Sequence, residues 1–326
     1  MKRRHLLAAM PAALASMSLV RPAFAATQLS FATPYPETNF MGQNNRMFAE
    51  GLTAASNGAL EVKRFPNATL LPMAQMKRGV QMGQVQIGEV LLSAYGNDDP
   101  FFELDGMPRL AGSWEDLRRL IDLARPYVEA RFAKQGMTLL YQVPWPPTGF
   151  FTNVPLPRIE ALNGMRLRTY SALSNRFAAL VGATPALVQI PEVPQAFATN
   201  VINAMITSAA AAADMQVWDF ARVFTPVDFS FSGDAIFMNR RALEALPKAQ
   251  QDLIREQAAI AEKRGWDMAK EAGVTQAATL AKNGVEISKP TPELMSGLDR
   301  IRDKLVGEWV ERAGADGKAL MAAYRG

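Results

Sequence analysis

The sequence predicts an α/β protein of two domains, crossed by one long helix. The chain has 326 residues, of which 49% are apolar and 20% charged, a composition typical of a folded protein with two domains of ordinary size. Strand-like and helix-like segments alternate in both halves, which favours a parallel or mixed sheet covered by helices. Residues 249–282 keep a helical pattern. A helix of that length extends for about 50 Å, farther than one small domain.

The first 25 residues are predicted to be a signal peptide outside the fold. Basic residues at Lys2–Arg4 precede an apolar stretch at 6–20, and Ala23–Ala25 has the small-x-small pattern of a cleavage site. The apolar stretch is shorter than a bilayer-spanning helix and contains Pro11. We therefore expect a periplasmic protein, cleaved after Ala25. The paired arginines leave both the general and the twin-arginine export routes open.

Composition also excludes several classes of function. The chain has no cysteine, and its one histidine, His5, lies in the predicted signal peptide. A chain without either residue has no thiol nucleophile, no imidazole base and no Cys or His metal ligand. Cleavage would leave 31 basic and 31 acidic residues, so the overall charge indicates no nucleic-acid partner. The sequence thus favours a binding protein over an enzyme, with no catalytic residue, metal or cofactor.

Domain I is predicted to comprise residues 26–150 and about 235–275. Its first half should contain strands and helices in alternation, and the segment 60–65 (LEVKRF) alternates apolar and polar residues as a strand does. Ser113 is a suitable N-cap for the helix that follows it. The strands are expected at 29–32, 60–65, 85–92 and 137–142, and the helices at 39–55, 74–82 and 113–134.

Domain II is predicted to comprise residues 151–234 and about 276–326. Strands are expected at 150–153, 165–170 and 201–206, and helices should begin at Ser171 or Ser174 and at Pro191. The chain then returns to domain I through a strand at 229–238 that ends at Asn239, a plausible helix cap. Within the long helical stretch that follows, Gly265 is the expected position of a kink.

Two further motifs each have a structural and a functional interpretation. Gly314–Lys318 (GADGK) superficially resembles a phosphate-binding loop, but it lacks the GxxxxGK spacing, so a helix-terminal turn is favoured. Asp98, Asp99, Glu103 and Asp105 form an acidic cluster that could supply the carboxylate pair of a glycosidase. Such clusters are more often solvated loops or helix caps, which is the interpretation we favour.

The segment 162–168 (LNGMRLR) carries the most informative pattern. Met165 and Leu167 alternate with Arg166 and Arg168 along a predicted strand, so the two arginines should share one face. An arginine on a rigid strand is a preorganised fork for a carboxylate, because its planar guanidinium can donate two parallel hydrogen bonds. Arginines on strands also commonly face solvent, so this pattern alone does not establish a site.

Several segments, taken together and in order, resemble one protein family. They are Phe31–Pro36 (FATPYP), Gly83–Gly88 (GQVQIG), Pro100–Glu103 (PFFE), Gly164–Arg168 (GMRLR), Gly182–Pro185 (GATP) with Glu192-Val193, Ala198–Ala204 (ATNVINA) and Val217–Phe220 (VWDF). In these segments the chain resembles the extracytoplasmic solute-binding proteins of tripartite ATP-independent periplasmic (TRAP) transporters, the DctP family. The segment GMRLR matches the family pattern G-x-K/R-x-R, and the resemblance extends over essentially the whole predicted mature chain.

This resemblance implies a two-domain fold of the periplasmic-binding-protein type, with a hinge, a long domain-spanning helix and a ligand cleft between the domains. It implies a receptor that captures an organic carboxylate and delivers it to a permease made of a small and a large membrane subunit. Two alternatives remain open. One is an exported lyase or glycosidase that uses the acidic cluster, and the other is a binding protein of another transporter or sensor system.

The resemblance also implies the residues of the ligand site. Arg168 corresponds to the arginine that pairs with the ligand carboxylate in the family. Trp145, Gly149 and Phe150 lie where the chain is expected to cross between the domains, and Gly149 occupies a region where some relatives have a second arginine. An aromatic wall and a single cation favour a monocarboxylate with an apolar body, such as an aryl or 2-oxo acid. The predicted ligand-binding residues are Arg168, Phe150, Trp145, Thr207, Tyr35, Ser93 and Ile190.

Overall fold

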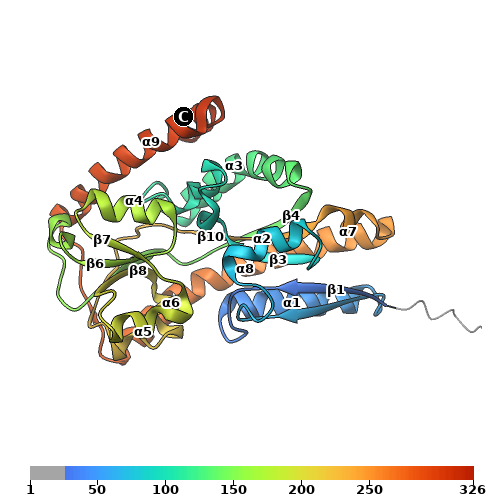
Figure 1. Cartoon of the computed structure of the whole chain (residues 1–326), viewed down its shortest axis with the longest axis horizontal. Coiled ribbons are helices and arrows are strands. Elements are labelled where there is room, and N and C mark those ends of the chain that lie inside the picture. Colours follow the sequence, from blue (N-terminus) through green and yellow to red (C-terminus); the bar gives the residue numbers. More distant parts are fainter. Residues whose placement is uncertain (1–25) are drawn as a thin grey trace, which may run out of the picture.

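Two separate β-sheets, joined by three crossings of the chain, organise the protein. The structure is a computed structural model that describes residues 26–326. Each sheet is covered by helices and forms one lobe of an elongated molecule (Figure 1). The predicted signal peptide, its cleavage site after Ala25 and His5 lie outside the described residues. No helix within residues 26–326 is long and apolar enough to cross a bilayer.

The sheet of domain I has five strands in the order β2-β1-β3-β10-β4. β1 runs parallel to β2 and β3, whereas β10 runs antiparallel to both of its neighbours. The late strand β10 therefore lies between two strands formed from the first half of the chain. The strands are β1 (Thr27–Ala32), β2 (Leu60–Phe65), β3 (Ile87–Leu91), β4 (Met137–Pro144) and β10 (Gly233–Asn239).

Three helices of domain I begin at side-chain caps. Asn39, Ser113 and Asn239 each accept a hydrogen bond from a backbone N–H of the first helical turn. These bonds satisfy donors that a helix end would otherwise leave unpaired. The elements are α1 (Phe40–Ala55), α2 (Met73–Gln81), α3 (Trp114–Lys134) and α7 (Arg240–Glu244), with short 3₁₀ helices η1 (Leu92–Tyr95) and η2 (Pro100–Gly106).

The sheet of domain II has six strands in the order β11-β9-β5-β8-β6-β7. β6 pairs in parallel with β7 and β8, and β5 pairs antiparallel with β8 and β9. The strands are β5 (Thr148–Thr152), β6 (Arg166–Thr169), β7 (Thr184–Leu187), β8 (Ala204–Ser208), β9 (Val223–Thr225) and β11 (Glu286–Ile287). The helices are α4 (Ala172–Leu180), α5 (Val193–Ala198) and α6 (Ala209–Asp214), with 3₁₀ turns η3 (Ile159–Leu162), η4 (Ile190–Glu192) and η5 (Val217–Asp219).

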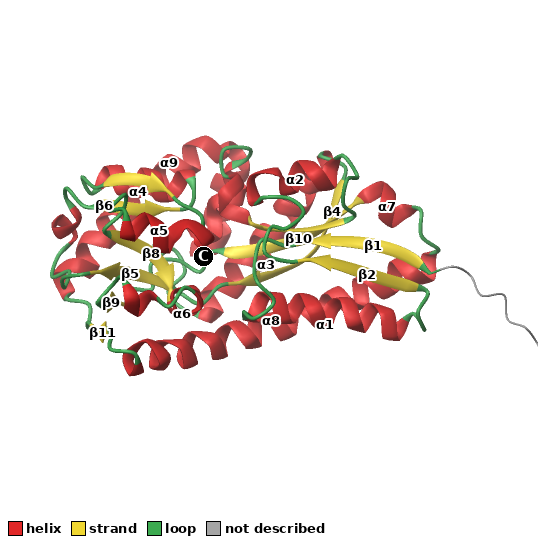
Figure 2. Cartoon of the chain, turned by 60° about the horizontal axis from the view of Figure 1, so that its bottom comes forward, coloured by secondary structure: helices red, strands yellow, loops and turns green. Residues whose placement is uncertain are grey.

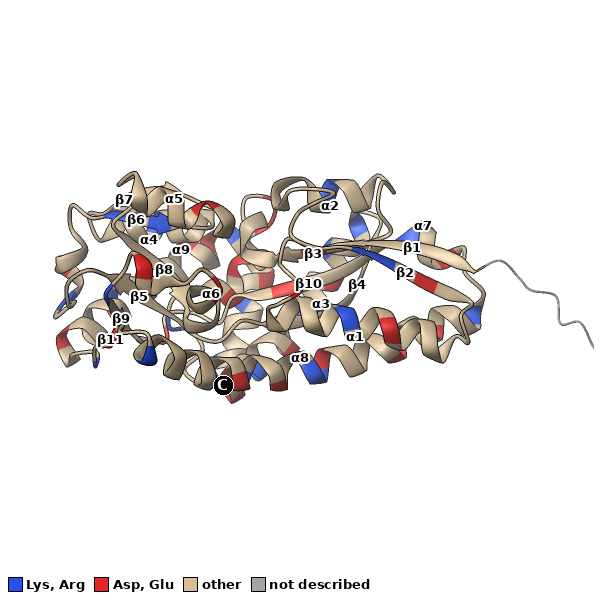
Figure 3. Ribbon diagram, turned by 90° about the horizontal axis from the view of Figure 1, so that it is seen from below, with Lys and Arg blue, Asp and Glu red and all other residues tan. Residues whose placement is uncertain are grey.

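The long helix α8 (Lys248–Lys282) extends along both lobes, as the sequence predicts (Figure 2). It contacts α1 and β4 in domain I and α6 and β11 in domain II. The helix is continuous through Gly265, where a kink was expected. A Cβ at Gly265 would lie 2.5 Å from Cγ2 of Val143, so the glycine allows α8 to approach β4 closely. Basic and acidic residues are interspersed along α1 and α8 (Figure 3).

The last helix, α9 (Pro292–Arg325), also contacts both lobes. It packs on η3 and α4 of domain II and on α3 and η2 of domain I. Gly314 interrupts it with φ +64°, so the segment GADGK forms a bend between two helical pieces. Trp309 Nε1 donates to the Pro100 carbonyl at 2.6 Å, and Arg131 pairs with Asp316 at 3.2 Å. The end of the chain, predicted to belong to domain II, is therefore tied to domain I.

The strand pairing also sets where the chain crosses between the sheets. β4 ends at Pro144 and β5 begins at Thr148, so residues 145–147 make the first crossing. Residues 148–150 pair in the second sheet, and 233–234 pair in the first, which moves the predicted boundaries by two or three residues. One apolar cluster joins the lobes, since Phe101 of η2 and Trp309 of α9 pack in the same core as Phe150.

Candidate functional site

A small cavity lies between the two sheets, at the point where their strand ends face each other. Its volume is about 50 Å³. Arg168 comes from β6 and Thr207 and Ser208 from the end of β8, while Leu91 ends β3 in the other sheet. Open α/β sheets bind ligands at these carboxyl ends of strands. We call it the cleft cavity; it is lined by Tyr35, Leu91, Trp145, Thr148, Arg168, Tyr170, Ile190, Thr207, Ser208, Ala211 and Ser232.

Arg168 is a buried cation with no carboxylate partner among residues 26–326. Its side chain is only 3% exposed. Nε donates to the Val188 carbonyl at 2.9 Å and Nη1 to the Ile206 carbonyl at 3.1 Å, which fixes the orientation of the guanidinium. The guanidinium carbon lies 5.1 Å from the centre of the Tyr170 ring. Burial lowers the pKa of Arg168 to about 10, so the side chain remains charged at neutral pH.

Arg166, two residues earlier on the same strand, lies in a different environment. Its side chain bonds to the side-chain oxygen of Asn200, and its backbone N–H donates to Asn203 Oδ1 at 2.9 Å. Arg166 does not line the cleft cavity. Of the two alternating arginines, only Arg168 therefore presents its charge to the space between the lobes.

The wall opposite Arg168 is aromatic and is held by a buried carboxyl group. Trp145 contacts Tyr35 and Phe40 edge-to-face, with ring centres 5.1 and 5.0 Å apart. Asp234 Oδ1 accepts hydrogen bonds from the Tyr35 hydroxyl at 3.1 Å and from Trp145 Nε1 at 3.3 Å. The two rings are thereby fixed to β10, an interior strand of the domain I sheet.

The structure brings five of the seven predicted ligand-binding residues together around the cleft cavity. They are Arg168, Trp145, Thr207, Tyr35 and Ile190. Phe150 does not line it: β5 carries this residue into domain II, where it is fully buried against Phe177 and Phe229. Ser93 does not line it either, because it lies buried in η1, with its Cβ beneath Gly106. Thr148, two residues before Phe150, lines the cavity instead.

Gly149 leaves no room for a side chain at its position. A Cβ there would lie 2.5 Å from the Thr225 carbonyl oxygen and 2.6 Å from the Phe224 ring. The contact with a backbone atom cannot be relieved by rotating a side chain. Gly149 is thus part of how β5 packs against β9, and the cleft cavity has Arg168 as its one cationic lining residue.

Sequence reasoning missed several hydroxyl groups of the site. The Tyr170 hydroxyl lies 3.4 Å from both Ser230 Oγ and Ser232 Oγ, and Thr148 Oγ1 lies 3.1 Å from Ser230 Oγ. Tyr170 was within reach of a sequence argument, because it follows Arg168 by two residues and strand alternation places both on one face. The serines arrive from the return crossing before β10, and no local pattern relates them to β6.

The acidic cluster after β3 holds the fold together. Asp98 pairs with Lys77, Asp99 pairs with Arg131 at 2.7 Å, and Glu103 pairs with Arg312 of α9. Asp105 is buried and accepts a hydrogen bond from the Gly233 N–H at 2.9 Å, and burial raises its pKa to about 7. None of the four lines the cleft cavity.

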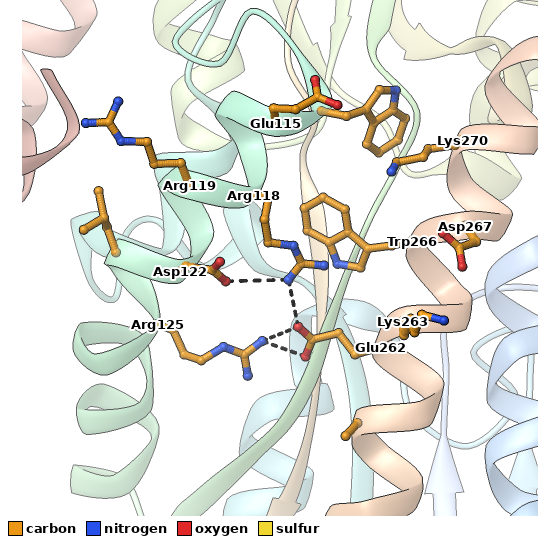
Figure 4. Close-up of a pocket in the computed structure, with 13 residues that line it drawn as sticks. Glu115, Arg118, Arg119, Asp122, Arg125, Glu262, Lys263, Trp266, Asp267 and Lys270 are labelled. Atoms are coloured by element: carbon orange, nitrogen blue, oxygen red, sulfur yellow. Dashed lines mark hydrogen bonds and ion pairs between the residues drawn. The ribbon is translucent and has the colours of Figure 1, made fainter.

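A second, much larger hollow of about 1070 Å³ lies between α3 and α8, away from the cleft cavity (Figure 4). We call it the α3–α8 groove. Glu262 lies on its floor and pairs with Arg125 at 2.5 Å and with Arg118 at 3.2 Å. The Arg118 guanidinium also stacks over Trp266, 3.5 Å from the ring centre. The groove has lining residues of both signs, and these two arginines are already paired.

Solved structures with this fold include two receptors from Bordetella pertussis that bind pyroglutamic acid. DctP7 is 42% identical, with 92% of this chain and 100% of that chain covered and a TM-score of 0.91. DctP6 is 37% identical, with 92% and 99% covered and a TM-score of 0.90. A TRAP solute-binding protein from a marine metagenome, specific for pyroglutamate, is 28% identical, with 93% and 99% covered and a TM-score of 0.90.

These likenesses confirm the predicted two-domain fold of periplasmic solute-binding proteins. The model of the DctP family, described as bacterial extracellular solute-binding protein, family 7, matches residues 31–311. That match covers both sheets, the crossings and most of α9. The chain therefore belongs to the DctP family of extracytoplasmic solute receptors, to which the resemblance in its sequence motifs pointed.

Proposed function

We propose that this protein is a periplasmic receptor for a small monocarboxylate, which it binds in the cleft cavity and delivers to a TRAP permease with a small and a large membrane subunit. The observation that carries this proposal is Arg168, a buried cation without a carboxylate partner in the described chain. A buried charge is costly unless it is paired. A ligand carboxylate would supply the missing charge and a second pair of hydrogen bonds.

The composition of the cavity supports a ligand with one negative charge. Arg168 is its one cationic lining residue, and Gly149 cannot be replaced by a second cation without moving β5. Trp145, Leu91 and Ile190 offer apolar contact to the rest of the molecule. The small cavity volume favours a compact acid over a sugar acid.

Pyroglutamate is the first ligand to test. It is a five-membered lactam with a single carboxylate, and the three related structures named above bind it. The predicted aryl and 2-oxo acids share its single charge but differ in the body attached to it. Phenylpyruvate and benzoylformate therefore belong in the same panel, with succinate and galacturonate as ligands of different charge and size.

We propose that the lobes separate to admit the ligand, because the cavity is lined by residues from both of them. Residues 145–147, the return crossing at 226–232 and the helix α8 connect the lobes. We propose that these connections form the hinge. For export, we propose that residues 1–25 direct the chain to the periplasm and are removed after Ala25, which the mass of the mature protein would test.

The decisive experiment is isothermal titration of the mature protein with the ligand panel. L-Pyroglutamate should bind tightest and should be recovered unchanged, as expected for a receptor. Arg168→Ala should lose binding, while Arg166→Ala, on the same strand but outside the cavity, should retain it. Tighter binding of succinate or galacturonate would contradict the monocarboxylate assignment, and conversion of the ligand to a product would contradict the receptor.

A further inference from the structure

Two carboxyl groups are buried side by side behind the aromatic wall of the cleft cavity. Glu89 of β3 and Asp234 of β10 are both 0% exposed. Ile236 is the register partner of Glu89, and Asp234 stands two residues from it, so the two acids are diagonal neighbours on adjacent antiparallel strands. Within residues 26–326 neither acid forms an ion pair with a lysine or arginine.

The four carboxyl oxygens divide into two that have partners and two that do not. Asp234 Oδ1 accepts from Trp145 Nε1, a group that can only donate, and from the Tyr35 hydroxyl. An oxygen that already accepts two hydrogen bonds is the less favourable place for a proton on this carboxyl group, which leaves Oδ2 for it. Glu89 Oε2 is bonded to the Thr33 hydroxyl. Asp234 Oδ2 and Glu89 Oε1 are buried without a hydrogen-bond partner, as is the side-chain nitrogen of Asn45, a neighbour of Glu89.

A proton between the two orphaned oxygens would satisfy both of them. Burial raises the pKa of Glu89 to about 7 and that of Asp234 well above its ordinary value, and the negative charge of Glu89 adds to the rise at Asp234. Burial also raises the pKa of Tyr35, so its hydroxyl keeps its proton. Two adjacent carboxyls that cannot both ionise commonly hold one proton in common.

We propose that Glu89 and Asp234 share one proton and fix the direction of the Tyr35 hydroxyl. This hydroxyl donates its proton to Asp234 and presents its oxygen to the cleft cavity as a hydrogen-bond acceptor. The receptor would then select acids with an N–H group near the carboxylate. Tyr35 lines the cavity, and its only proton is directed to Asp234. The Trp145 N–H is directed there as well. What this wall offers a ligand is therefore an oxygen lone pair. This inference rests on the proposed function and specifies its ligand class.

A pair of ring compounds tests the inference on the wild-type protein. L-Pyroglutamate has an N–H in its ring, and the (S)-γ-lactone of 2-hydroxyglutarate has an oxygen at the same place, with the same carboxylate and carbonyl. A lactone would set an oxygen against the Tyr35 oxygen, so it should bind roughly 10- to 100-fold more weakly. Equal affinities would overturn this inference and leave the receptor intact. Binding of phenylpyruvate or benzoylformate with neither ring compound bound would also overturn this inference alone, whereas failure of every monocarboxylate in the panel would overturn the proposed function and this inference with it.

Variants then locate the origin of the selectivity. Tyr35→Phe removes the acceptor and should bring the lactam-to-lactone ratio close to 1. Asp234→Asn and Glu89→Gln each place an amide N–H where the shared proton would be, so both should keep the wild-type ratio. Asp234→Leu should lose it, with the melting temperature reporting whether that variant folds. A ratio that persists in Tyr35→Phe, or collapses in both amide variants, would overturn the assignment.

Discussion

The cleft cavity and the α3–α8 groove both contain arginines, but they satisfy them differently. In the groove, Arg118 and Arg125 share the carboxylate of Glu262, and Arg118 stacks on Trp266. In the cavity, Arg168 donates to two backbone carbonyls, lies over the Tyr170 ring and contacts no carboxylate of the described chain. The groove measures about 1070 Å³ and the cavity about 50 Å³, so the proposed binding site is the smaller of the two.

The difference shows how the charge balance of a hollow separates a structural cluster from a binding site. Paired groups stabilise the elements that carry them, here α3 and α8. A buried and unpaired cation destabilises the empty protein and is compensated only when an anion arrives. The cavity should therefore control affinity and the groove stability, and each can be altered without the other.

The largest effect is expected at Arg168. Replacing it by alanine should weaken binding by roughly 2–5 kcal/mol, because the ligand carboxylate would be buried without its partner. Arg168→Met keeps much of the side-chain volume and removes the charge, so it should also lose binding while the empty protein melts no lower than the wild type. Titration calorimetry and thermal melts measure the two quantities. A ligand affinity close to wild type in both variants would contradict the comparison.

Glu262 should show the reverse behaviour. The side chain is 14% exposed and is shared by two arginines, so Glu262→Ala leaves two partly buried cations without a partner. We expect a loss of about 1–3 kcal/mol in the free energy of unfolding. Ligand affinity should stay within about threefold of the wild type, a change of under 1 kcal/mol. Urea titration gives the first value. A large loss of affinity with unchanged stability would place the groove in the binding machinery.

Buried carboxyl groups that have no cationic partner should make the stability of the protein depend on pH. Burial raises the pKa of Asp105 and of Glu89 to about 7. Between their ordinary values and pH 7 the folded state holds more protons than the unfolded state, so the free energy of unfolding should fall as pH rises through that range. The melting temperature should be higher at pH 5 than at pH 8. Asp105→Asn should flatten this slope, whereas Asp252→Asn should not, because the pKa of Asp252 is lowered by Lys248.

The smallest effect is expected for an exposed pair. Arg176 donates to both carboxylate oxygens of Glu308 at 2.6 and 3.0 Å, a good geometry, but both side chains are solvated. Water screens such pairs, and ordering the side chains costs entropy. Arg176→Ala should leave the melting temperature and the ligand affinity unchanged within error. A clear drop in either would show that pairing, rather than burial, determines what these arginines contribute.

Local signals predicted most of the elements. Asn39, Ser113 and Asn239 indicated where helices begin, and the alternation in LEVKRF indicated β2. The kink expected at Gly265 was wrong. A glycine lowers the local stability of a helix, but here it allows α8 to pack closely against β4. The short strands β7, β9 and β11 were missed, since two to four residues carry no recognisable period.

The site was predictable only where a family motif reached it. Arg168 lies within such a motif, and Trp145 lies at a crossing marked by prolines. Phe150 was misplaced, because strand alternation gives its face and not its depth along β5. Asp234 was missed: in sequence it is one acid in a buried strand, and its partners Tyr35, Glu89 and Trp145 are brought to it only by the pairing of β10 with β3 and β4.

The position of β10 between β3 and β4 has a consequence for the order in which the protein can fold. β3 and β4 are synthesised early, but the strand that separates them ends at Asn239, after all but one strand of domain II. Because the N-terminus is made first, the five-stranded sheet of domain I cannot be completed until more than two thirds of the protein has been synthesised. Such long-range pairing slows folding. A chain exported in the unfolded state would thus complete the domain I sheet only late in its translocation, so its own topology would delay folding.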